Sequence, residues 1–471
     1  MLDAVARFTD RIGGQNVITD PSEQTPYLHE WRDRYVGRAG AILLPRTVDD
    51  VAACVALASS QHIPIVPQGG NTGLVGGQTP DRSGNAVVLS LAKLNAIREV
   101  DPTGNTMTVD AGVVLQTIQQ EADKVDRLFP LALGAQGSCM IGGNLSTNAG
   151  GTGVLAYGNT RDLVLGLEVV LPDGRILNGL SKLRKDNTGY DLKHLFIGAE
   201  GTLGVITGAT LKLFPKPAGM RTAMIGLDSP QKALTLYGQM RDLAGSSLTG
   251  FEIMPRLGMD FVSRHLPDAR DPLDQQQAWY VLAEVSSGRG EEEAESLLMA
   301  AMEQAFENGT MNDAAIAQSE AQAQSFWALR HGMSEAQKPE GGSIKHDVSV
   351  PVASVADFLE ETIAAVTTMV PGCRPLPFGH LGDGNIHFNV SQPVGADMAD
   401  YLARWEEMNA LVHGIVMSYG GSISAEHGVG QAKRDLLPDV KDPVALDLMR
   451  ILKTAIDPNG IMNPGKVLTL E

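Results

Sequence analysis

The sequence predicts an α+β protein of two or three packed domains. Short β-branched runs divided by turn residues fill residues 1–215, and amphipathic helical stretches alternate with strand-like runs after them. The length of 471 residues exceeds one ordinary domain, and 43% hydrophobic with 20% charged residues is typical of a globular protein.

The first region begins with a predicted β-α-β unit. An apolar strand runs to Pro45, and Thr47 with Asp50 three residues later forms a capping box that predicts the start of a helix. A second strand follows at 63–67 and leads into glycines. Further strands are predicted at 85–91, 106–114, 166–177 and 204–214, the third of them folded at the hairpin signal Asp173-Gly174.

A break in this pattern at Lys216–Gly219 predicts a domain boundary. Beyond it, helices are predicted at 230–245 and 291–308, and strands at 278–287 and 343–351. This alternation predicts a second α+β domain. A C-terminal helix ends at Asp457-Pro458.

Composition excludes several classes of partner. A net charge of −18 argues against nucleic acid and anionic membrane surfaces, since both require an excess of lysine and arginine. No apolar run approaches the roughly 18 residues of a membrane span, and residues 1–14 resemble neither a signal nor a transit peptide. Cys54, Cys139 and Cys373 form no CxxC pair. We therefore expect free thiols in a cytoplasmic protein.

Three glycine-rich segments stand out at 67–80, 133–153 and 198–210. Consecutive backbone N–H groups without side-chain obstruction make an anion-binding concavity. Neither the P-loop pattern nor GxGxxG fits the first segment, which by itself is also compatible with a mobile loop. Three such segments together indicate one extended ligand.

A histidine pair lies in "FGHLGDGNIHFNV", residues 378–390. Asp383-Gly384 is favoured in two-residue type I′ turns, and a hairpin about it would place His380 directly opposite His387. Directly paired side chains are about 5 Å apart at Cβ, close enough for two imidazoles to reach one ion. A purely structural histidine pair is the alternative.

The second strand of this hairpin has a polar face. His387 and Asn389 share it by the two-residue period, while the residues between them point into packing. Further along the chain, Glu426 and His427 are adjacent in a glycine-flanked loop. Glutamate with two histidines is a common ligand set for zinc with one position left open.

Two cations are candidates for holding an anion. Arg330 and Ser334 lie four residues apart, on one face of a predicted helix, and Lys345, Asp347 and Ser349 share one face of a predicted strand. For isolated residues, ordinary solvated charge is the competing interpretation.

The three glycine segments carry a family resemblance. In the order "PQGGNTGLVGG", "GSCMIGGNLSTNAGG" and "EGTLGVIT" they resemble the FAD-binding domain of the vanillyl-alcohol-oxidase-like flavoproteins. The C-terminal half resembles the branch that oxidises D-2-hydroxy acids. The resemblance implies a two-subdomain FAD-binding domain at 1–217, an α+β substrate domain at 218–420, and a C-terminal helical segment at 421–471 that completes the flavin and metal site.

The resemblance also implies which residues contact FAD. The cofactor is expected to be non-covalent, because Gln68 to Asn71 contain no histidine for attachment. The implied contacts are Pro67, Gly69, Gly70, Asn71, Thr72, Gly73, Leu74, Gly76 and Gly77; Leu133, Gly134, Gly137, Ser138, Gly142, Gly143, Asn144, Thr147, Asn148, Gly150 and Gly151; and Glu200, Gly201, Gly204, Ile206 and Asn463.

At the substrate end the resemblance implies a zinc or other divalent metal site and a catalytic base. The implied metal ligands are His380, His387 and Glu426, and the implied substrate contacts are Arg330, Ser334, Lys345 and Asn389. His427 is the candidate base, with a purely positioning role as its alternative.

The implied reaction is oxidation of a D-2-hydroxy acid by metal-assisted deprotonation of the hydroxyl and hydride transfer to flavin. D-2-hydroxyglutarate is the favoured substrate, and D-lactate, D-malate and glycolate stay open. The family suggests an electron-transfer flavoprotein or a quinone-linked carrier as acceptor, and analogy suggests a homodimer. A non-catalytic binding module stapled by zinc is the competing hypothesis.

Overall fold

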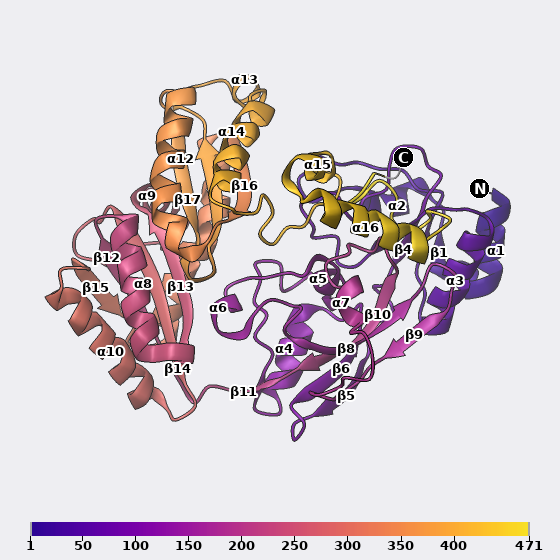
Figure 1. Cartoon of the computed structure of the whole chain (residues 1–471), viewed down its shortest axis with the longest axis horizontal. Coiled ribbons are helices and arrows are strands. Elements are labelled where there is room, and N and C mark those ends of the chain that lie inside the picture. The colour runs from indigo at the N-terminus through magenta and orange to yellow at the C-terminus, as the bar shows by residue number, and fades with distance from the viewer. Residues whose placement is uncertain (1, 470–471) are drawn as a thin grey trace. The chain divides into compact units, whose positions relative to one another are not determined.

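The computed structural model of this chain describes residues 2–469 and divides into two compact units (Figure 1). The first unit comprises the described parts of Met1–Gly151, Tyr157–Lys216 and Glu426–Glu471. The second comprises Thr152–Ala156 and Pro217–Ala425. The segment from Glu426 onward therefore packs with the N-terminal part of the chain.

The first unit contains a four-stranded sheet of order β1-β2-β4-β3. Its strands are Val17–Ile18 (β1), Ala41–Leu43 (β2), Ile65–Gln68 (β3) and Val87–Ser90 (β4), flanked by α1 (Leu2–Ile12), α2 (Pro21–Leu28) and α3 (Val48–Ser60). The predicted capping box is present: Thr47 Oγ1 accepts from the N–H of Asp50, and Asp50 accepts from the N–H of Thr47. The predicted β-α-β unit is therefore confirmed, with β2 and β3 each parallel to β4.

A five-stranded antiparallel sheet of order β5-β6-β10-β8-β9 forms the second part of this unit. Its strands are Ile97–Asp101 (β5), Thr106–Asp110 (β6), Val164–Val170 (β8), Ile176–Gly179 (β9) and Val205–Lys212 (β10), and the pair Arg127–Leu128 (β7) and Phe214–Pro215 (β11) lies apart. The helices are α4 (Leu115–Asp123), α5 (Ile141–Thr147), α7 (Lys193–Phe196), α15 (Leu437–Val440) and α16 (Pro443–Ile456), whereas α6 (Val154–Tyr157) belongs to the second unit except for Tyr157. The predicted hairpin at Asp173-Gly174 joins β8 to β9.

The second unit is built on one seven-stranded antiparallel sheet of order β15-β12-β14-β13-β17-β18-β16. The strands are Gly219–Leu227 (β12), Leu248–Pro255 (β13), Trp279–Ser287 (β14), Asp313–Ile316 (β15), Ser343–Ser349 (β16), Arg374–His380 (β17) and Asn385–Ser391 (β18). The helices are α8 (Pro230–Ala244), α9 (Arg256–His265), α10 (Glu291–Glu307), α11 (Glu320–Ala336), α12 (Val355–Met369), α13 (Met398–Leu402) and α14 (Trp405–Ser418).

The two faces of this sheet differ in how they are covered. Helices α8, α10, α12 and α14 cover one face along its length, over a core that includes Ile253, Ile386, Phe388 and Val390 (Figure 1). On the other face, α9 and α11 pack over the middle strands in a second core. Toward β16 and β18 that second face becomes polar.

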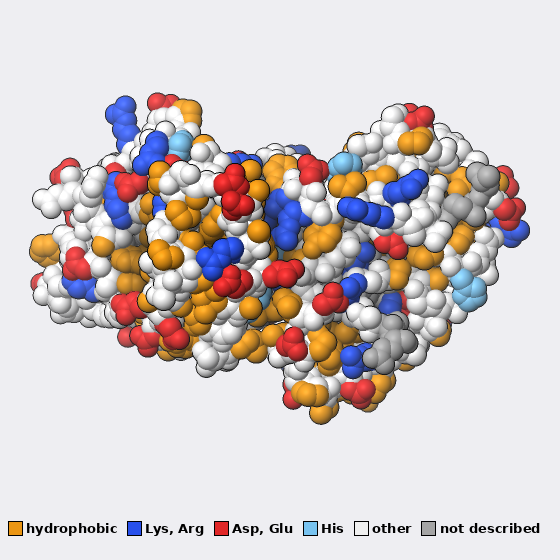
Figure 2. Space-filling view, turned by 90° about the horizontal axis from the view of Figure 1, so that it is seen from above, with side chains coloured by type: hydrophobic (Ala, Val, Ile, Leu, Met, Phe, Trp, Pro, Cys, Tyr) orange, Lys and Arg blue, Asp and Glu red, His pale blue; other side chains and the backbone are white. Residues whose placement is uncertain are grey.

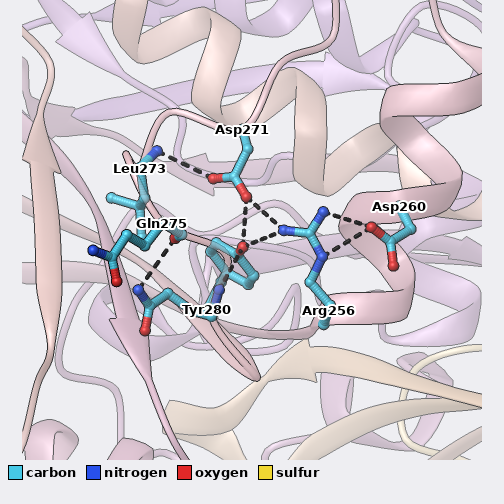
Figure 3. Close-up of polar contacts among 7 residues, drawn as sticks. Arg256, Asp260, Asp271, Leu273, Gln275 and Tyr280 are labelled. Carbon is cyan, nitrogen blue, oxygen red and sulfur yellow. Dashed lines mark hydrogen bonds and ion pairs between the residues drawn. The ribbon is translucent and has the colours of Figure 1, made fainter.

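A charged cluster fixes the start of α9. Arg256 donates to Asp260 Oδ1, to Asp271 Oδ2 and to the hydroxyl of Tyr280, and that hydroxyl donates to Asp271 (Figure 3). The cluster ties the connection between α9 and β14 to the sheet.

Surface charge is mixed rather than segregated on the face drawn in Figure 2, where acidic and basic side chains are interspersed with hydrophobic ones. Among residues 2–469, no helix combines the length and the hydropathy that crossing a membrane requires.

Candidate active site

The first unit contains an open cavity of about 130 Å³. All three glycine-rich segments line it, together with Leu91 and His427. The sequence-predicted segments are thus brought to one place.

The first glycine segment presents its backbone to this cavity. Within the described chain, none of the N–H groups from Gly69 to Gly77 donates a hydrogen bond to the protein. The loop is braced instead by side chains at its start. Gln68 Nε2 donates to the carbonyls of Tyr27 and Gln78, at 2.9 and 3.0 Å. A braced loop with unsatisfied amides fits the pyrophosphate of FAD.

Buried polar atoms of the cavity wall also lack partners. Asn71 and Asn144 both line the cavity. Among described atoms, the Oδ1 of each is buried without a hydrogen bond. Asn71 Nδ2 is used, because it donates to the carbonyls of Pro26 and His29. Buried acceptors of this kind are costly unless a ligand or water donates to them, so the wall fits a polar cofactor.

Glycines of these segments serve two different purposes. A Cβ on Gly70 would lie 2.1 Å from the carbonyl oxygen of Ser138, so this glycine allows the first two segments to touch. A Cβ on Gly143 would meet no protein atom within 4 Å. Gly143 instead leaves room in the cavity.

Glu200 fastens the loop that carries His427. Its carboxylate accepts from the N–H groups of Val429 and Gly430, at 2.7 and 2.8 Å. Burial raises the pKa of Glu200, and these hydrogen bonds oppose the rise. Asn463 Nδ2 adds a second link, donating to the carbonyls of Gly77 and Glu200 at 2.9 and 2.7 Å.

The predicted FAD contacts fall into two groups by position. The predicted residues that line the cavity are Pro67, Gly69, Gly70, Asn71, Thr72, Gly73, Gly77, Gly142, Gly143, Asn144, Thr147, Glu200, Gly201, Gly204 and Ile206. The predicted residues that do not line it are Leu74, Gly76, Leu133, Gly134, Gly137, Ser138, Asn148, Gly150, Gly151 and Asn463. Wall residues that were not among the predicted FAD contacts are Gln68, Val75, Gln78, Leu91, Cys139, Met140, Ser146 and Val205.

In the second unit, the predicted polar strand face is present on β16 and β18. The ladder pairs Lys345 with Asn389 and Asp347 with His387, so these four side chains share one face. The residues between them on β18 are fully buried on the opposite face. The two-residue alternation that the sequence predicted is therefore confirmed.

The predicted hairpin register is wrong. His380 pairs with Asn385, and His387 pairs with Phe378. The turn is a four-residue loop that includes the 3₁₀ turn Leu381–Asp383, not a two-residue type I′ turn. The two histidines are diagonal neighbours rather than direct partners. Their ring centroids are nevertheless only 5.7 Å apart.

Glu252 of β13 contacts both His380 and Arg330. Its Oε1 lies 2.5 Å from His380 Nδ1, and its Oε2 accepts from Arg330 Nε at 2.7 Å. Burial alone would raise the pKa of Glu252, but the charges and hydrogen bonds of His380 and Arg330 hold it well below its usual range. An ionised carboxylate only accepts, so His380 donates from Nδ1.

The substrate-binding candidates of the second unit lie beside this carboxylate. Arg330 of α11 is buried and stacks over the ring of Phe378, with its guanidinium carbon 4.7 Å from the ring centroid. Lys345 Nζ donates to the main-chain carbonyl of Ser334 at 3.5 Å. The main chain at Ser334 is therefore next to Lys345.

The acidic groups around His387 are also hydrogen-bonded. Asp347 Oδ1 accepts from Asn385 Nδ2 at 3.0 Å and lies 4.0 Å from His387 Nδ1. In the turn, burial raises the pKa of Asp383 to about 6, against the opposing effects of His380 and of the N–H of Asn385.

The sequence analysis missed Glu252, although a signal was present. Glu252 is the one charged residue in the strand "LTGFEIMP", whose eight residues are all buried. A lone acid in an apolar strand requires buried cationic partners. The sequence alone could not say which.

The other two predicted site residues belong to the first unit. Glu426 is its first residue after the chain leaves the second unit, and Glu426 Oε1 lies 3.9 Å from His427 Nε2. His427 lines the cavity of the glycine segments.

Comparisons with known proteins agree with this arrangement. A model of the FAD binding domain matches residues 39–179, and a model of the C-terminal domain of FAD linked oxidases matches residues 216–467. The chain is 39% identical over 465 residues to the mitochondrial D-2-hydroxyglutarate dehydrogenase of Bos taurus. The matched region covers 98% of this chain and 82% of that protein.

A bacterial relative and a solved structure extend the comparison. The D-2-hydroxyglutarate dehydrogenase of Xanthomonas citri pv. viticola is 37% identical to this chain over 449 residues. The match covers 95% of this chain and 93% of the bacterial protein. The structure of alkyldihydroxyacetonephosphate synthase matches with a TM-score of 0.77 at 17% identity, over 98% of this chain and 86% of that one. At this identity the structural match shows a shared fold.

Proposed function

Because this chain belongs to the FAD-linked oxidase family, we propose that it oxidises D-2-hydroxyglutarate to 2-oxoglutarate with non-covalent FAD and a divalent metal ion. The observation that carries the substrate assignment is that relatives matching nearly the whole chain bear the name D-2-hydroxyglutarate dehydrogenase. Membership in a family of oxidases disfavours the competing hypothesis of a non-catalytic module.

Two cations are proposed to hold the two carboxylates of the substrate. Arg330 uses Nε on Glu252, so its two terminal nitrogens remain suited to bidentate pairing with a carboxylate. Lys345, on the polar strand face with Asn389, supplies the second charge. D-Lactate has one carboxylate and would use only one of these cations. Ser334 and Asn389 are proposed to donate further hydrogen bonds.

His380, His387 and Glu426 are proposed to hold a divalent ion. The proximity of the two imidazoles supports this, and the donor types suit zinc. Chain connectivity supports the third ligand. The N–H of Ala425 donates to the carbonyl of Asp347 at 3.3 Å, and the next Cα is about 3.8 Å along the chain. Glu426 therefore directly follows a residue that is hydrogen-bonded to Asp347, the ladder partner of His387.

The chemistry divides between the bound groups and the side chains. FAD would accept the hydride from C2, and a divalent ion would polarise the 2-hydroxyl, lowering its pKa. His427 is proposed to take the proton of that hydroxyl as the C2–H bond breaks. One hydride, a proton with two electrons, would leave C2 for the flavin, the hydroxyl proton would go to a ring nitrogen of His427, and the product would be the 2-oxo acid.

Anaerobic absorbance at the flavin band tests the proposal. Purified, metal-replete protein should bleach rapidly with D-2-hydroxyglutarate, and a chelator should abolish the bleaching. The L-enantiomer, D-lactate, D-malate and glycolate are the parallel additions. Bleaching by one of these instead would reject the proposed substrate, and a protein that reconstitutes with neither FAD nor activity would reject the whole assignment.

The reduced flavin must pass its electrons on. We propose an electron-transfer flavoprotein or a quinone-linked carrier as the acceptor. Reoxidation of bleached protein by each carrier, followed at the flavin band, distinguishes them. Reoxidation by neither would reject this part of the proposal.

A further inference from the structure

We propose that Glu252 is a positioning residue that sets both the metal-binding histidine His380 and the substrate-binding arginine Arg330. The inference rests on the proposed function, because it concerns the residues assigned there to the metal and to a substrate carboxylate. It adds a residue that neither the sequence motifs nor the family comparisons pointed to.

The first step is the shared contact. Glu252 stands opposite His380 in the β13–β17 ladder, so their side chains emerge on the same face of the sheet. Each carboxylate oxygen has its own partner: Oε1 faces His380 Nδ1 at 2.5 Å, and Oε2 faces Arg330 Nε at 2.7 Å. Only 1% of the Glu252 side chain and 7% of the Arg330 side chain are exposed.

The second step concerns the tautomer of His380. A carboxylate bonded at Nδ1 requires that nitrogen to carry the proton. Nε2 then has the lone pair that metal ligation uses, and the ring is oriented with Nε2 pointing away from Glu252. The carboxylate of Glu252 thus selects the ligand atom.

The third step concerns Arg330. Glu252 holds its Nε edge, and the ring of Phe378 holds its flat face at 4.7 Å from the guanidinium carbon. The plane of the guanidinium is fixed by these two contacts before any substrate arrives. A preorganised arginine loses less freedom when it pairs with a carboxylate.

The carboxylate of Glu252 therefore links His380, which is assigned to the metal ion, with Arg330, which is assigned to a substrate carboxylate. Glutamine at this position keeps the size of the side chain but has only one acceptor oxygen. Its NH₂ group either faces an N–H donor or donates to Nδ1 of the other His380 tautomer, whose Nε2 carries the proton and has no lone pair for a metal. The variant Glu252→Gln therefore loses either a hydrogen bond or the ligating tautomer of His380.

The chain offers a matched control in Glu284. It lies on the neighbouring strand β14, opposite Gly250, and it accepts from Trp327 Nε1 at 2.9 Å and from Thr222 at 3.3 Å. Glu284→Gln therefore makes the same chemical change in the same sheet. Its hydrogen-bond donors Trp327, Thr222 and Thr249 are not among the proposed metal or substrate residues.

The test measures the affinity of FAD-loaded, full-length protein for Zn²⁺ by competition with a chromogenic chelator. We expect Glu252→Gln to weaken Zn²⁺ binding by about tenfold to a hundredfold, the usual effect of losing a hydrogen bond behind a metal-binding histidine. Glu284→Gln should stay within about threefold of wild type. In steady-state assays, Glu252→Gln should also raise KM for the hydroxy acid, whereas Glu284→Gln should not.

Each other outcome overturns the inference. Unchanged Zn²⁺ affinity in Glu252→Gln, with or without lower thermal stability, would make Glu252 a purely structural partner of Arg330. Equal losses in both variants would indicate general damage to the sheet. If Glu252→Gln does not fold, Glu252→Asp keeps the charge but is too short to reach both partners, and the same criteria apply. Wild type that binds no Zn²⁺ would instead reject the metal part of the proposed function.

Discussion

Adjacent glycines in α5 should respond in opposite ways to the same substitution. Gly143→Ala places a methyl group in open space at the cavity wall, since no protein atom lies within 4 Å of that Cβ position. Alanine also suits a helix better than glycine does, by up to about 1 kcal/mol. The apoprotein should therefore be as stable as wild type or slightly more stable.

The same methyl group should nonetheless weaken FAD binding. Inserting one extra carbon into a filled site typically costs about 1–3 kcal/mol. Because each 1.4 kcal/mol corresponds to roughly a factor of ten, FAD should bind about tenfold to a hundredfold more weakly. Titration of apoprotein with FAD, followed by quenching of flavin fluorescence, measures this directly.

Gly142→Ala is the matched comparison. Its Cβ would lie 2.7 Å from the Cβ of Ala111 and 3.0 Å from the carbonyl oxygen of that residue. The clash should outweigh the helix preference and lower the melting temperature of the apoprotein. Wild-type FAD affinity in a stable Gly143→Ala protein would refute the assignment of this cavity to FAD.

Three further predictions concern the second unit and the metal. Arg330→Lys should raise KM for D-2-hydroxyglutarate by about tenfold to a hundredfold in steady-state assays, because lysine lacks the planar fork that pairs with a carboxylate; an unchanged KM would contradict the role of Arg330. Removing metal with a chelator should abolish turnover while the flavin absorbance spectrum is retained, because the proposed FAD contacts lie in the first unit; loss of the flavin band would contradict this. Hydrogen bonds from His265, Arg374 and Arg264 lower the pKa of Glu340 to about 2 despite its burial, so its stabilising effect is complete above the ordinary value near 4.5 and is lost as the pH falls toward 2. Glu340→Gln should thus lower the free energy of unfolding by about 1–3 kcal/mol at pH 7 and by progressively less below pH 4.5 in urea titrations, and a difference independent of pH would reject the ion pairs as its source.

Local signals predicted the elements well but failed at one turn. Thr47 and Asp50 form the predicted capping box, and the alternation on β18 gave the correct buried face. At Asp383-Gly384 a tertiary contact overrides the turn preference. The N–H of Val350 donates to the carbonyl of Gly384 at 3.1 Å, and a Cβ on Gly384 would lie 2.1 Å from the carbonyl oxygen of Val350. Docking against the end of β16 therefore sets the register.

Glycine clusters predicted where the backbone approaches something, but not what it approaches. Gly70 adjoins the backbone at Ser138, whereas Gly143 adjoins open cavity, and the two look alike in sequence. The distinction depends on which segments meet, and those are far apart along the chain. Sequence could therefore assign the ligand-binding region but not each residue's part in it.

Glu252 shows how energetics can recover what periodicity misses. Burying an ionised carboxylate costs several kcal/mol unless paired charges and hydrogen bonds offset the loss of water. Its position in an apolar strand is thus evidence for buried cationic partners, and these lie 78 and 128 residues further along the chain, at Arg330 and His380. Removing Glu252 alone would leave the buried charge of Arg330 uncompensated. Strand β13 is therefore expected to tolerate an apolar residue at this position only if Arg330 is replaced as well.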